Sequence, residues 1–367
     1  MDAPSAHPVA RQPGLRSGTG RVCGTVPGPP VGVVQSAQRD PQPLEIAFVN
    51  LMPDTAFSDT EEQFLGILSD AARRHQSPLR VRRYWIRGVP RGASVMRRIS
   101  RSYLEIDTLI GSQVDGLIVT GTEPRAETIE DEAFWPALAQ LIEWSSEAVP
   151  SVLLSCLAAH AAAKLFQGVE RTLLPQKLSG VFRTERAGTG AIAQGLPTPV
   201  WLPHSRSNDI PTSRLTARGY RPVLTAGESW TALEFERSQA RFLVFQGHPE
   251  YAGNSLLREH RRDVRRYLNG ERPLYPPVPE GYLDQSGLRL LEDFAALPTT
   301  IARDPAGLST FPTQAVEAHI QPTWRHVAET LYGNWLAQVQ SRRAARKSAD
   351  PILKAGLPRY GEVSANA

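Results

Sequence analysis

The sequence predicts an α/β fold: a mostly parallel sheet with helices on both faces. Short apolar runs alternate with helical patterns along the first half of the chain, and each run ends at a turn. Apolar runs without polar alternation are typical of parallel strands, because such strands are buried on both faces. Strands that alternate with helices of this length connect by right-handed crossovers, which also favours a parallel sheet. The strands are expected at 44–50, 79–86, 115–121, 151–156 and 242–245.

Capping residues and apolar spacing predict the helices. Ser58 and the acids after it are expected to begin a helix that ends near Arg74, with Phe64 and Leu68 on its apolar face. Further helices are expected at about 102–110, at 132–147, directly after Cys156, at 255–268 and at 324–340. Between these, residues 172–230 contain strand-like patches and many turns, which indicate an antiparallel excursion.

Composition divides the chain into three parts. Residues 1–43 are rich in Pro, Gly, Ser and Ala and poor in acids, so a disordered leader is predicted, with a transit peptide as the alternative. Residues 44–340 contain all the strand and helix signals and are expected to form one domain. Residues 341–367 are polar and basic, which predicts a flexible tail.

Composition and charge narrow the classes of partner. The chain is 41% hydrophobic and 21% charged, as in soluble globular proteins. Its arginine runs lie in separate elements without interleaved aromatics, which favours a solvated surface over nucleic-acid binding and also suits a coenzyme with several phosphates. No apolar stretch is long enough to span a bilayer, and no secretory signal is found. Only two cysteines occur, Cys23 and Cys156, so a cytoplasmic protein without a structural disulfide is predicted.

Cys156 ends an apolar run, and an Ala-rich helical pattern follows it at once. A cysteine at a strand-to-helix turn lies at the carboxyl edge of the sheet, where the helix N-terminus favours a thiolate. A small buried core residue is the alternative interpretation of such a cysteine.

A second polar group follows the strand 242–245 in the segment Gly247-His248-Pro249-Glu250-Tyr251. His248 and Glu250 are two residues apart, so on an extended backbone their side chains leave on the same side. With Cys156 they supply a nucleophile, a base and a carboxylate that orients the base. The eight histidines show no metal-ligand spacing, and no glycine-rich phosphate loop follows a strand, so neither a metal nor a dinucleotide cofactor is expected.

Over residues 44–340 the chain resembles the homoserine O-succinyltransferase family, which has the class I glutamine-amidotransferase-like (flavodoxin-like) fold. The matching motifs occur in family order: Asn50-Leu51-Met52-Pro53, Thr60-Glu61-Glu62-Gln63-Phe64, the strand 115–121, Trp135, Cys156 with its Ala-rich helix, Lys177-Leu178-Ser179-Gly180-Val181, Pro203-His204-Ser205-Arg206, Gly247-His248-Pro249-Glu250-Tyr251, Arg262-Asp263, and Trp324-Arg325 with Asn334-Trp335-Leu336.

The resemblance implies an acyltransferase catalytic domain over residues 44–340, which uses acyl-CoA as co-substrate without a further cofactor. The implied reaction moves a succinyl group to the hydroxyl of homoserine, a step of methionine biosynthesis. Cys156 resembles the nucleophile that carries the acyl group in a ping-pong mechanism, His248 the general base, and Glu250 the group that orients it. The residues that resemble positions holding the acceptor or supporting the acyl site are Lys177, Ser205 and Arg262. The implied partners are small molecules, and a homodimer is left open.

Three departures from the family pattern leave alternatives open. Asp54 and Thr55 stand where the family has two lysines, which removes positive charge near the expected entrance, and Leu157 stands where a tryptophan is common. Arg125 falls at the position where the family has Gly for succinyl or Glu for acetyl. Because a guanidinium pairs with a carboxylate, Arg125 is expected to favour succinyl-CoA, with a solvated loop arginine as the alternative.

Three other functions are compatible with these residues. One is O-acylation, with succinyl or acetyl, of serine or a related amino alcohol. Another is an amidase or glutaminase-type hydrolase on the same fold. The third is a relative that binds ligands without catalysis.

Overall fold

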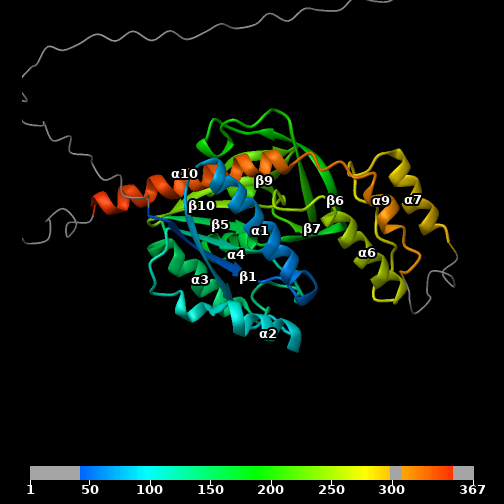
Figure 1. Ribbon diagram of the computed structural model, residues 1–367, viewed down its shortest axis with the longest axis horizontal. Helices are drawn as coiled ribbons and strands as arrows, with labels where there is room; N and C mark the ends of the chain where they lie inside the picture. The colour runs from blue at the N-terminus through cyan, green and yellow to red at the C-terminus, as the bar shows by residue number, and fades with distance from the viewer. Residues whose placement is uncertain (1–41, 298–307, 350–367) are drawn as a thin grey trace, which may run out of the picture. The chain divides into compact units, whose positions relative to one another are not determined.

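A computed structural model describes residues 42–297 and 308–349 of the chain. Its ten-stranded sheet has the order β3-β2-β1-β4-β5-β10-β9-β8-β6-β7 (Figure 1). The strands from β3 to β10 pair in parallel, and those from β10 to β7 pair antiparallel. The parallel strands are β1 (Leu44–Asn50), β2 (Leu79–Trp85), β3 (Leu104–Glu105), β4 (Gly116–Val119), β5 (Ser151–Ser155) and β10 (Ala240–Phe245). The predicted α/β fold with a mostly parallel sheet is confirmed.

Helices cover both faces of the parallel half because alternate strand residues point to opposite faces. Ile46 and Phe48 of β1 belong to one core, which also contains residues of α1 (Asp54–Arg74) and α10 (Arg325–Ala349). Ala47 and Val49 belong to the other core, together with residues of α3 (Trp135–Ala148) and α4 (Leu157–Gln167). In Figure 1, α1 and α10 lie side by side over the sheet.

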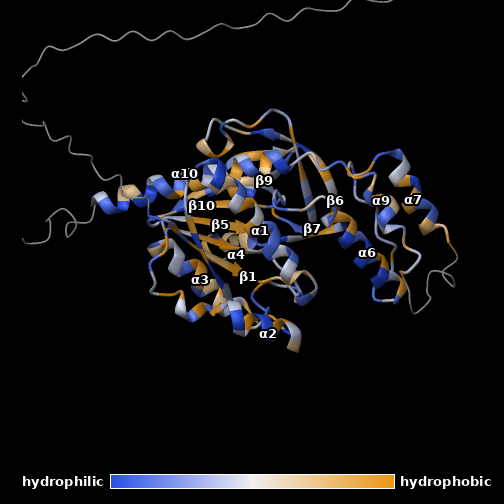
Figure 2. Ribbon diagram, in the orientation of Figure 1, coloured by the Kyte–Doolittle hydropathy of each residue, from blue (hydrophilic) through white to orange (hydrophobic). Residues whose placement is uncertain are grey.

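The antiparallel half is built from β6 (Thr172–Arg186), β7 (Val200–Asp209), β8 (Arg221–Ala226) and β9 (Ser229–Arg237), as the pattern of residues 172–230 predicts. The remaining helices are α2 (Ala93–Ser102), α5 (Thr212–Thr216), α6 (Ser255–Leu268), α7 (Gln285–Ala295) and α9 (Thr313–Glu317), with 3-10 turns at Ile106–Thr108 and Ala191–Ala193. Figure 2 shows that the central strands β5 and β10 are apolar, whereas α6 is mostly hydrophilic.

Two predicted helices differ from the structure, one in where it begins and one in whether it exists. The helix expected from Ser58 begins four residues earlier, because Pro53 has a φ of −63° and starts the helix as its N-cap. The helix expected at 102–110 is wrong: α2 ends at Ser102, and β3 and a 3-10 turn follow. Leu104 and Glu105 of that stretch pair with β2, and Ile106 begins the 3-10 turn.

The last helix is longer than the pattern predicts. It continues to Ala349, so the first part of the predicted flexible tail is helical. Arg342 donates to the Gln239 carbonyl over 2.9 Å, and Arg343 donates to the Pro43 carbonyl over 2.9 Å, which holds this end against the sheet. The described residues begin at residue 42, one residue before the predicted end of the leader. Residues 1–41 and 350–367, which include Cys23 and most of the predicted leader and tail, lie outside the described residues. No described helix has the length and apolar character needed to cross a membrane.

Candidate active site

Cys156 lies in a strained turn between β5 and α4, which we call the Cys156 turn (residues 155–157). Its backbone has φ 51° and ψ −112°, a conformation that non-glycine residues adopt only when their surroundings enforce it. The Cys156 N–H donates to the Phe245 carbonyl of β10 over 2.7 Å. On the other side Gly121 is so close that a Cβ there would lie 3.0 Å from the Cβ of Cys156. Its partial exposure and strained backbone differ from those of a buried core cysteine.

His248 and Glu250 form a buried pair beside this turn. His248 Nδ1 lies 2.8 Å from Glu250 Oε1, and the same carboxylate oxygen accepts a 3.4 Å bond from the Ser155 hydroxyl. The pair meets Cys156 because β5 and β10 are parallel neighbours, with Phe245 in register with Ser155. Their carboxyl ends therefore lie at the same edge of the sheet.

The protonation of His248 depends on both neighbours. Burial disfavours the imidazolium, but the charges of Glu250 and Cys156 outweigh burial and hold the pKa of His248 well above its usual value. His248 Nε2 is buried and has no well-aligned hydrogen-bond partner among the described residues. Glu250 thus holds the imidazolium at Nδ1, and the Cys156 sulfur beside the ring further favours its protonated form.

A second group of polar residues, which we call the Lys177 cluster, adjoins the first through Tyr251. The Tyr251 ring stacks on His248 at a centroid distance of 4.3 Å, and its hydroxyl donates to Glu259 Oε1 over 2.5 Å. The members of the cluster are Lys177, Ser205, Tyr251, Glu259, Arg262 and Asp263. The structure thus brings together three residues from the sequence prediction, Lys177, Ser205 and Arg262, with three further polar residues.

Glu259 and Asp263 hold the cations of this cluster in place. Lys177 Nζ lies 3.0 Å from Glu259 Oε2 and 2.8 Å from Asp263 Oδ2. Arg262 Nε donates to Asp263 Oδ1 over 3.1 Å. Burial alone would raise the pKa of Glu259, but Lys177 and Arg262 lower it to about 2. The cluster therefore holds fixed, paired charges of both signs.

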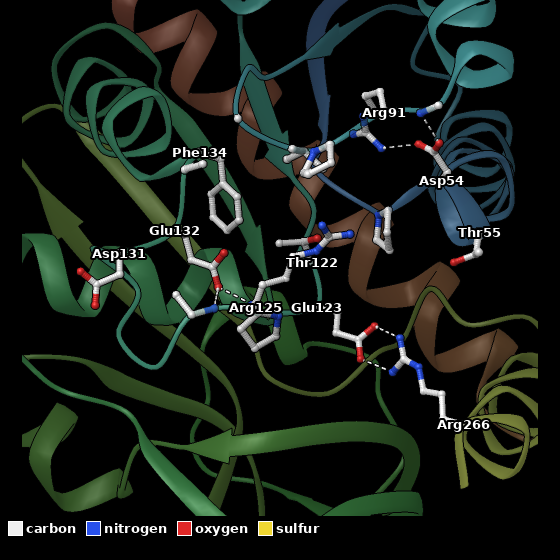
Figure 3. A pocket seen from close by; sticks show the side chains of 18 of the residues that line it. Asp54, Thr55, Arg91, Thr122, Glu123, Arg125, Asp131, Glu132, Phe134 and Arg266 are labelled. Carbon is white, nitrogen blue, oxygen red and sulfur yellow. Dashed lines mark hydrogen bonds and ion pairs between the residues drawn. The ribbon is translucent and has the colours of Figure 1, made fainter. Parts of the chain in front are cut away.

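A pocket of about 1010 Å³ lies beyond the carboxyl ends of β1, β2 and β4 (Figure 3). It contains Arg125, whose side chain is exposed and makes no ion pair with any described residue. On the neighbouring wall, Arg266 pairs with both carboxylate oxygens of Glu123. Arg266 Nη1 also lies 3.8 Å from Asp263 Oδ1, so this wall of the pocket contacts the Lys177 cluster.

Glu132 sets the position of the Arg125 loop. Its buried carboxylate accepts the backbone N–H of Arg125 over 2.6 Å and that of Ala126 over 2.9 Å. Two charge-assisted bonds to one carboxylate fix the backbone on both sides of the Arg125 Cα. The backbone position from which the Arg125 side chain enters the pocket is therefore fixed (Figure 3).

Sequence reasoning missed Glu259, Glu132 and the close approach of Gly121. Glu259 and Asp263 are four residues apart on α6, a spacing that places two carboxylates on one helical face. That spacing, beside the Arg262-Asp263 motif, was an available signal. For Glu132 the sequence offers no comparable signal, because its partners are backbone amides of a loop. Among the described residues no group of three or more His, Cys, Asp or Glu could hold a metal ion.

Comparison with known proteins now identifies the family. The model of the homoserine O-succinyltransferase family matches residues 31–345. The chain belongs to this family. It is 40% identical to the homoserine O-succinyltransferase of Methylorubrum extorquens, over 82% of this chain and 88% of that protein. It is 39% identical to the enzyme of the same name from Rhodopseudomonas palustris, over 81% of this chain and 89% of that protein.

Among solved structures the chain is similar to a glutamine amidotransferase from Thermotoga maritima, with a TM-score of 0.43 and 14% identity over 81% of this chain and 98% of that chain. A likeness at that level carries no information about function.

Proposed function

We propose that this member of the family transfers a succinyl group from succinyl-CoA to the hydroxyl of homoserine through an acyl thioester on Cys156. The supporting observation is the strained Cys156 turn, which presents the sulfur beside the buried His248–Glu250 pair. This arrangement supplies the nucleophile, the base and the orienting carboxylate of a covalent acyl transfer.

In the first half-reaction the Cys156 thiolate attacks the thioester carbonyl, and the CoA sulfur leaves with the proton of the His248 imidazolium, so one thioester replaces another and the His248 ring becomes neutral. Sulfur is both the attacking and the leaving atom, which makes this exchange easy. Leu157 is the first residue of α4, so its N–H has no acceptor within that helix and is the donor that we assign to the oxyanion.

In the second half-reaction the acceptor hydroxyl attacks the acyl-enzyme. Near neutral pH an alcohol does not ionise by itself, so His248 takes its proton while the Cys156 thiolate leaves. Glu250 holds Nδ1 of His248, which directs Nε2 toward the reacting atoms. The Cys156 thiolate and the His248 imidazolium of the starting state are thereby restored, and CoA has already left as the thiol.

The Lys177 cluster is suited to the acceptor. An amino acid carries a carboxylate and an ammonium, and the cluster offers cations at Lys177 and Arg262 and carboxylates at Glu259 and Asp263. Arg262 suits the acceptor carboxylate because a guanidinium can donate two parallel bonds. Glu259 of the cluster accepts the Tyr251 hydroxyl, and the Tyr251 ring stacks on His248. An acceptor bound at the cluster would therefore lie within reach of the base.

Arg125 is proposed to recognise the free carboxylate of the succinyl group. It lines the pocket that also contains Thr122, one residue after the Gly121 that packs against Cys156, and it has no ion-pair partner among the described residues. An acetyl group has no carboxylate to pair with, so this residue favours succinyl-CoA. Acyl-CoA then acts as co-substrate without a further cofactor, in a cytoplasmic step of methionine biosynthesis.

The competing functions predict different products. A glutaminase would release ammonia from glutamine, a serine acyltransferase would acylate serine faster than homoserine, and a binding relative would form no covalent species. The charged pairing within the Lys177 cluster favours an amino-acid acceptor over water, which needs no such site.

Intact-mass and peptide mass spectrometry of the full chain mixed with succinyl-CoA test the proposal. We expect one succinyl group on the peptide that contains Cys156, and its loss when homoserine is added. Cys156→Ala is the matched control and should carry no adduct, while Cys23 serves as a second thiol in the same molecule. An adduct on Cys23 alone, or full turnover by Cys156→Ala, would overturn the mechanism. Ammonia release from glutamine would instead support a hydrolase.

A further inference from the structure

A connected chain of polar side chains, which we call the Arg206 network, joins the elements that carry Cys156 and His248. Its members, in order of contact, are His160, Gln246, Asp209, Arg206, His204 and Thr231. All are buried except Asp209, which is partly buried. Buried polar groups cost free energy unless each is bonded, so a chain this long calls for an explanation.

Arg206 occupies the middle of the network. Its side chain is only 3% exposed, with Nη1 2.6 Å from His204 Nδ1 and Nη2 3.2 Å from Asp209 Oδ2. A guanidinium can only donate, so His204 Nδ1 must accept, and the neutral ring then donates from Nε2 to the Thr231 hydroxyl at 3.3 Å. Burial, followed by the charges of Arg206 and His248, keeps the pKa of His204 well below its usual value, which agrees with a neutral ring.

The other half of the network has an equally fixed direction. Asp209 can only accept as a carboxylate, so Gln246 must donate Nε2 to it, over 2.8 Å. Gln246 Oε1 then accepts from His160 Nε2 at 3.1 Å. Burial lowers the pKa of His160 to about 4, so this ring is also neutral near pH 7. Arg206 and Asp209 are the charged members, and the network has one consistent set of donors and acceptors.

Both ends of the network touch the reacting residues. His160 lies one helical turn after Cys156 on α4, and its N–H donates to the Cys156 carbonyl over 3.2 Å. At the other end the His204 ring packs against Gly247, where an added Cβ would lie 3.2 Å from His204 Nε2. The next residue, His248, donates its N–H to the Pro203 carbonyl over 2.7 Å. The position of the base is thus tied to the strand that carries His204 and Arg206.

We propose that Arg206 is a positioning residue, which holds the Cys156 turn and the His248 loop in register and whose fixed positive charge favours the thiolate of Cys156. This role rests on the proposed function only in taking Cys156 and His248 as the reacting groups. Around Cys156, burial lowers the pKa of both Arg171 and Arg206, and the nearby charge of Cys156 opposes this effect in each, while His248 and Tyr251 face the same sulfur. Of these, Arg206 is the cation bonded into the network that joins both catalytic elements.

The test is the pH dependence of alkylation of Cys156 by iodoacetamide, which reports the thiolate and needs no acyl-CoA. Rates are followed by peptide mass spectrometry, so that Cys23 in the same chain is an internal reference. In Arg206→Gln the pH at which alkylation reaches half of its maximal rate should rise by about one unit or more. The reaction at neutral pH should then be roughly tenfold slower than in wild type. Arg206→Lys keeps the positive charge but lacks the planar fork that bonds His204 and Asp209 at the same time. It should keep the pH midpoint while lowering kcat.

Arg206→Gln leaves Asp209 without its cation, which can impair folding, so the double variant Arg206→Gln/Asp209→Asn provides a second measurement. It removes both charges and keeps hydrogen-bonding groups at both positions. In the double variant the midpoint should also rise, with Cys23 unchanged. A midpoint within about 0.3 pH units of wild type in either folded variant would overturn the role of the charge, since it corresponds to roughly a twofold change in thiolate. This result would leave the succinyl adduct on Cys156 unaffected, so the two proposals fail separately.

Discussion

Replacing Gly121 by alanine should damage the Cys156 turn, because the space beside it is too small for a methyl group. An added Cβ would lie 3.0 Å from Cys156 Cβ, 3.2 Å from the Ser155 carbonyl oxygen and 3.3 Å from the Leu157 nitrogen. Carbon atoms in good contact lie about 3.5–4.0 Å apart. All three neighbours are backbone or the first side-chain atom, so none can rotate away. The turn must therefore move by a few tenths of an ångström.

The magnitude follows from this geometry. Overpacking a well-packed site costs about 1–3 kcal/mol, which in a domain of this size lowers Tm by roughly 2–10 °C. Catalysis is more sensitive, since a displacement of about 1 Å at reacting groups costs around a hundredfold. A smaller shift of the sulfur should slow acylation of Cys156 about tenfold, by the same argument. The assay is the rapid-mixing rate at which free CoA appears, with Tm measured by calorimetry.

Gly66→Ala is the matched control. Gly66 lies within α1, and an added Cβ there meets no atom within 4 Å. Alanine favours a helix over glycine by about 0.5–1 kcal/mol, so this variant should be slightly more stable and fully active. Wild-type acylation and wild-type Tm in Gly121→Ala would refute the reasoning, because the close contact would then impose no constraint on the turn.

Three further predictions concern the base, the acyl group and pH. His248→Ala should lower kcat by several orders of magnitude, because base and nucleophile act as a unit, and Glu250→Gln should cost less; near-normal turnover without His248 would show that another group is the base. Arg125→Ala should lower the preference for succinyl-CoA over acetyl-CoA, measured as a ratio of kcat/KM, by about thirtyfold if its ion pair contributes on the order of 2 kcal/mol. A ratio unchanged within about twofold would assign Arg125 to the solvent. Glu259 has a folded pKa of about 2, below its unfolded value of about 4.3, so its stabilisation is complete above about pH 5 and is lost as the pH falls toward 2. The free energy of unfolding, measured with urea between about pH 5.5 and 3, should therefore fall more for wild type than for Glu259→Gln, by on the order of 2 kcal/mol over this range, and equal slopes would contradict this.

The sheet could be predicted because each central strand is a short apolar run that ends at a turn residue. The runs at 44–50 and 242–245 correspond closely to β1 and β10. Periodicity carries no information on the order of strands, however. That β5 lies between β4 and β10 depends on long-range packing, and this order is what brings Cys156 and His248 to one edge. Helix limits failed where a local feature overrode the pattern, as Pro53 does at the start of α1.

The site was predictable only where its residues lie next to a strand end or match the family. Cys156, His248 and Glu250 follow strands, and their proximity in the structure agrees with the pattern, although their catalytic roles stay predictions. Glu259 lies on α6 in a run of charged residues that resembles a solvated helix face. Its partner Lys177 is distant in sequence, on β6, so the pairing is visible only in the folded chain.

Asp54, where the family has a lysine, was expected to leave the pocket entrance with less positive charge. The structure gives Asp54 another role. Its Oδ2 accepts the Gly92 N–H, over 2.6 Å, and its Oδ1 lies 3.5 Å from Arg91 Nη1. Arg91 is only 3% exposed, donates to the Asn50 carbonyl over 3.3 Å, and lies 4.6 Å from the centre of the Phe57 ring.

Burial lowers the pKa of Arg91, and the charge of the adjacent Asp54 opposes that effect. The ion pair therefore keeps Arg91 charged and connects the end of β1 to the loop after β2. Asp54 therefore adds little negative field to the pocket, since its charge is neutralised within the wall. On the opposite wall Arg266 is neutralised by Glu123 in the same way. Arg125 thus differs from both, because no described carboxylate pairs with its guanidinium. The proposed recognition of succinyl by Arg125 therefore uses a positive charge on the loop after β4, at the wall of the pocket where the guanidinium has no described carboxylate partner, rather than at the end of β1.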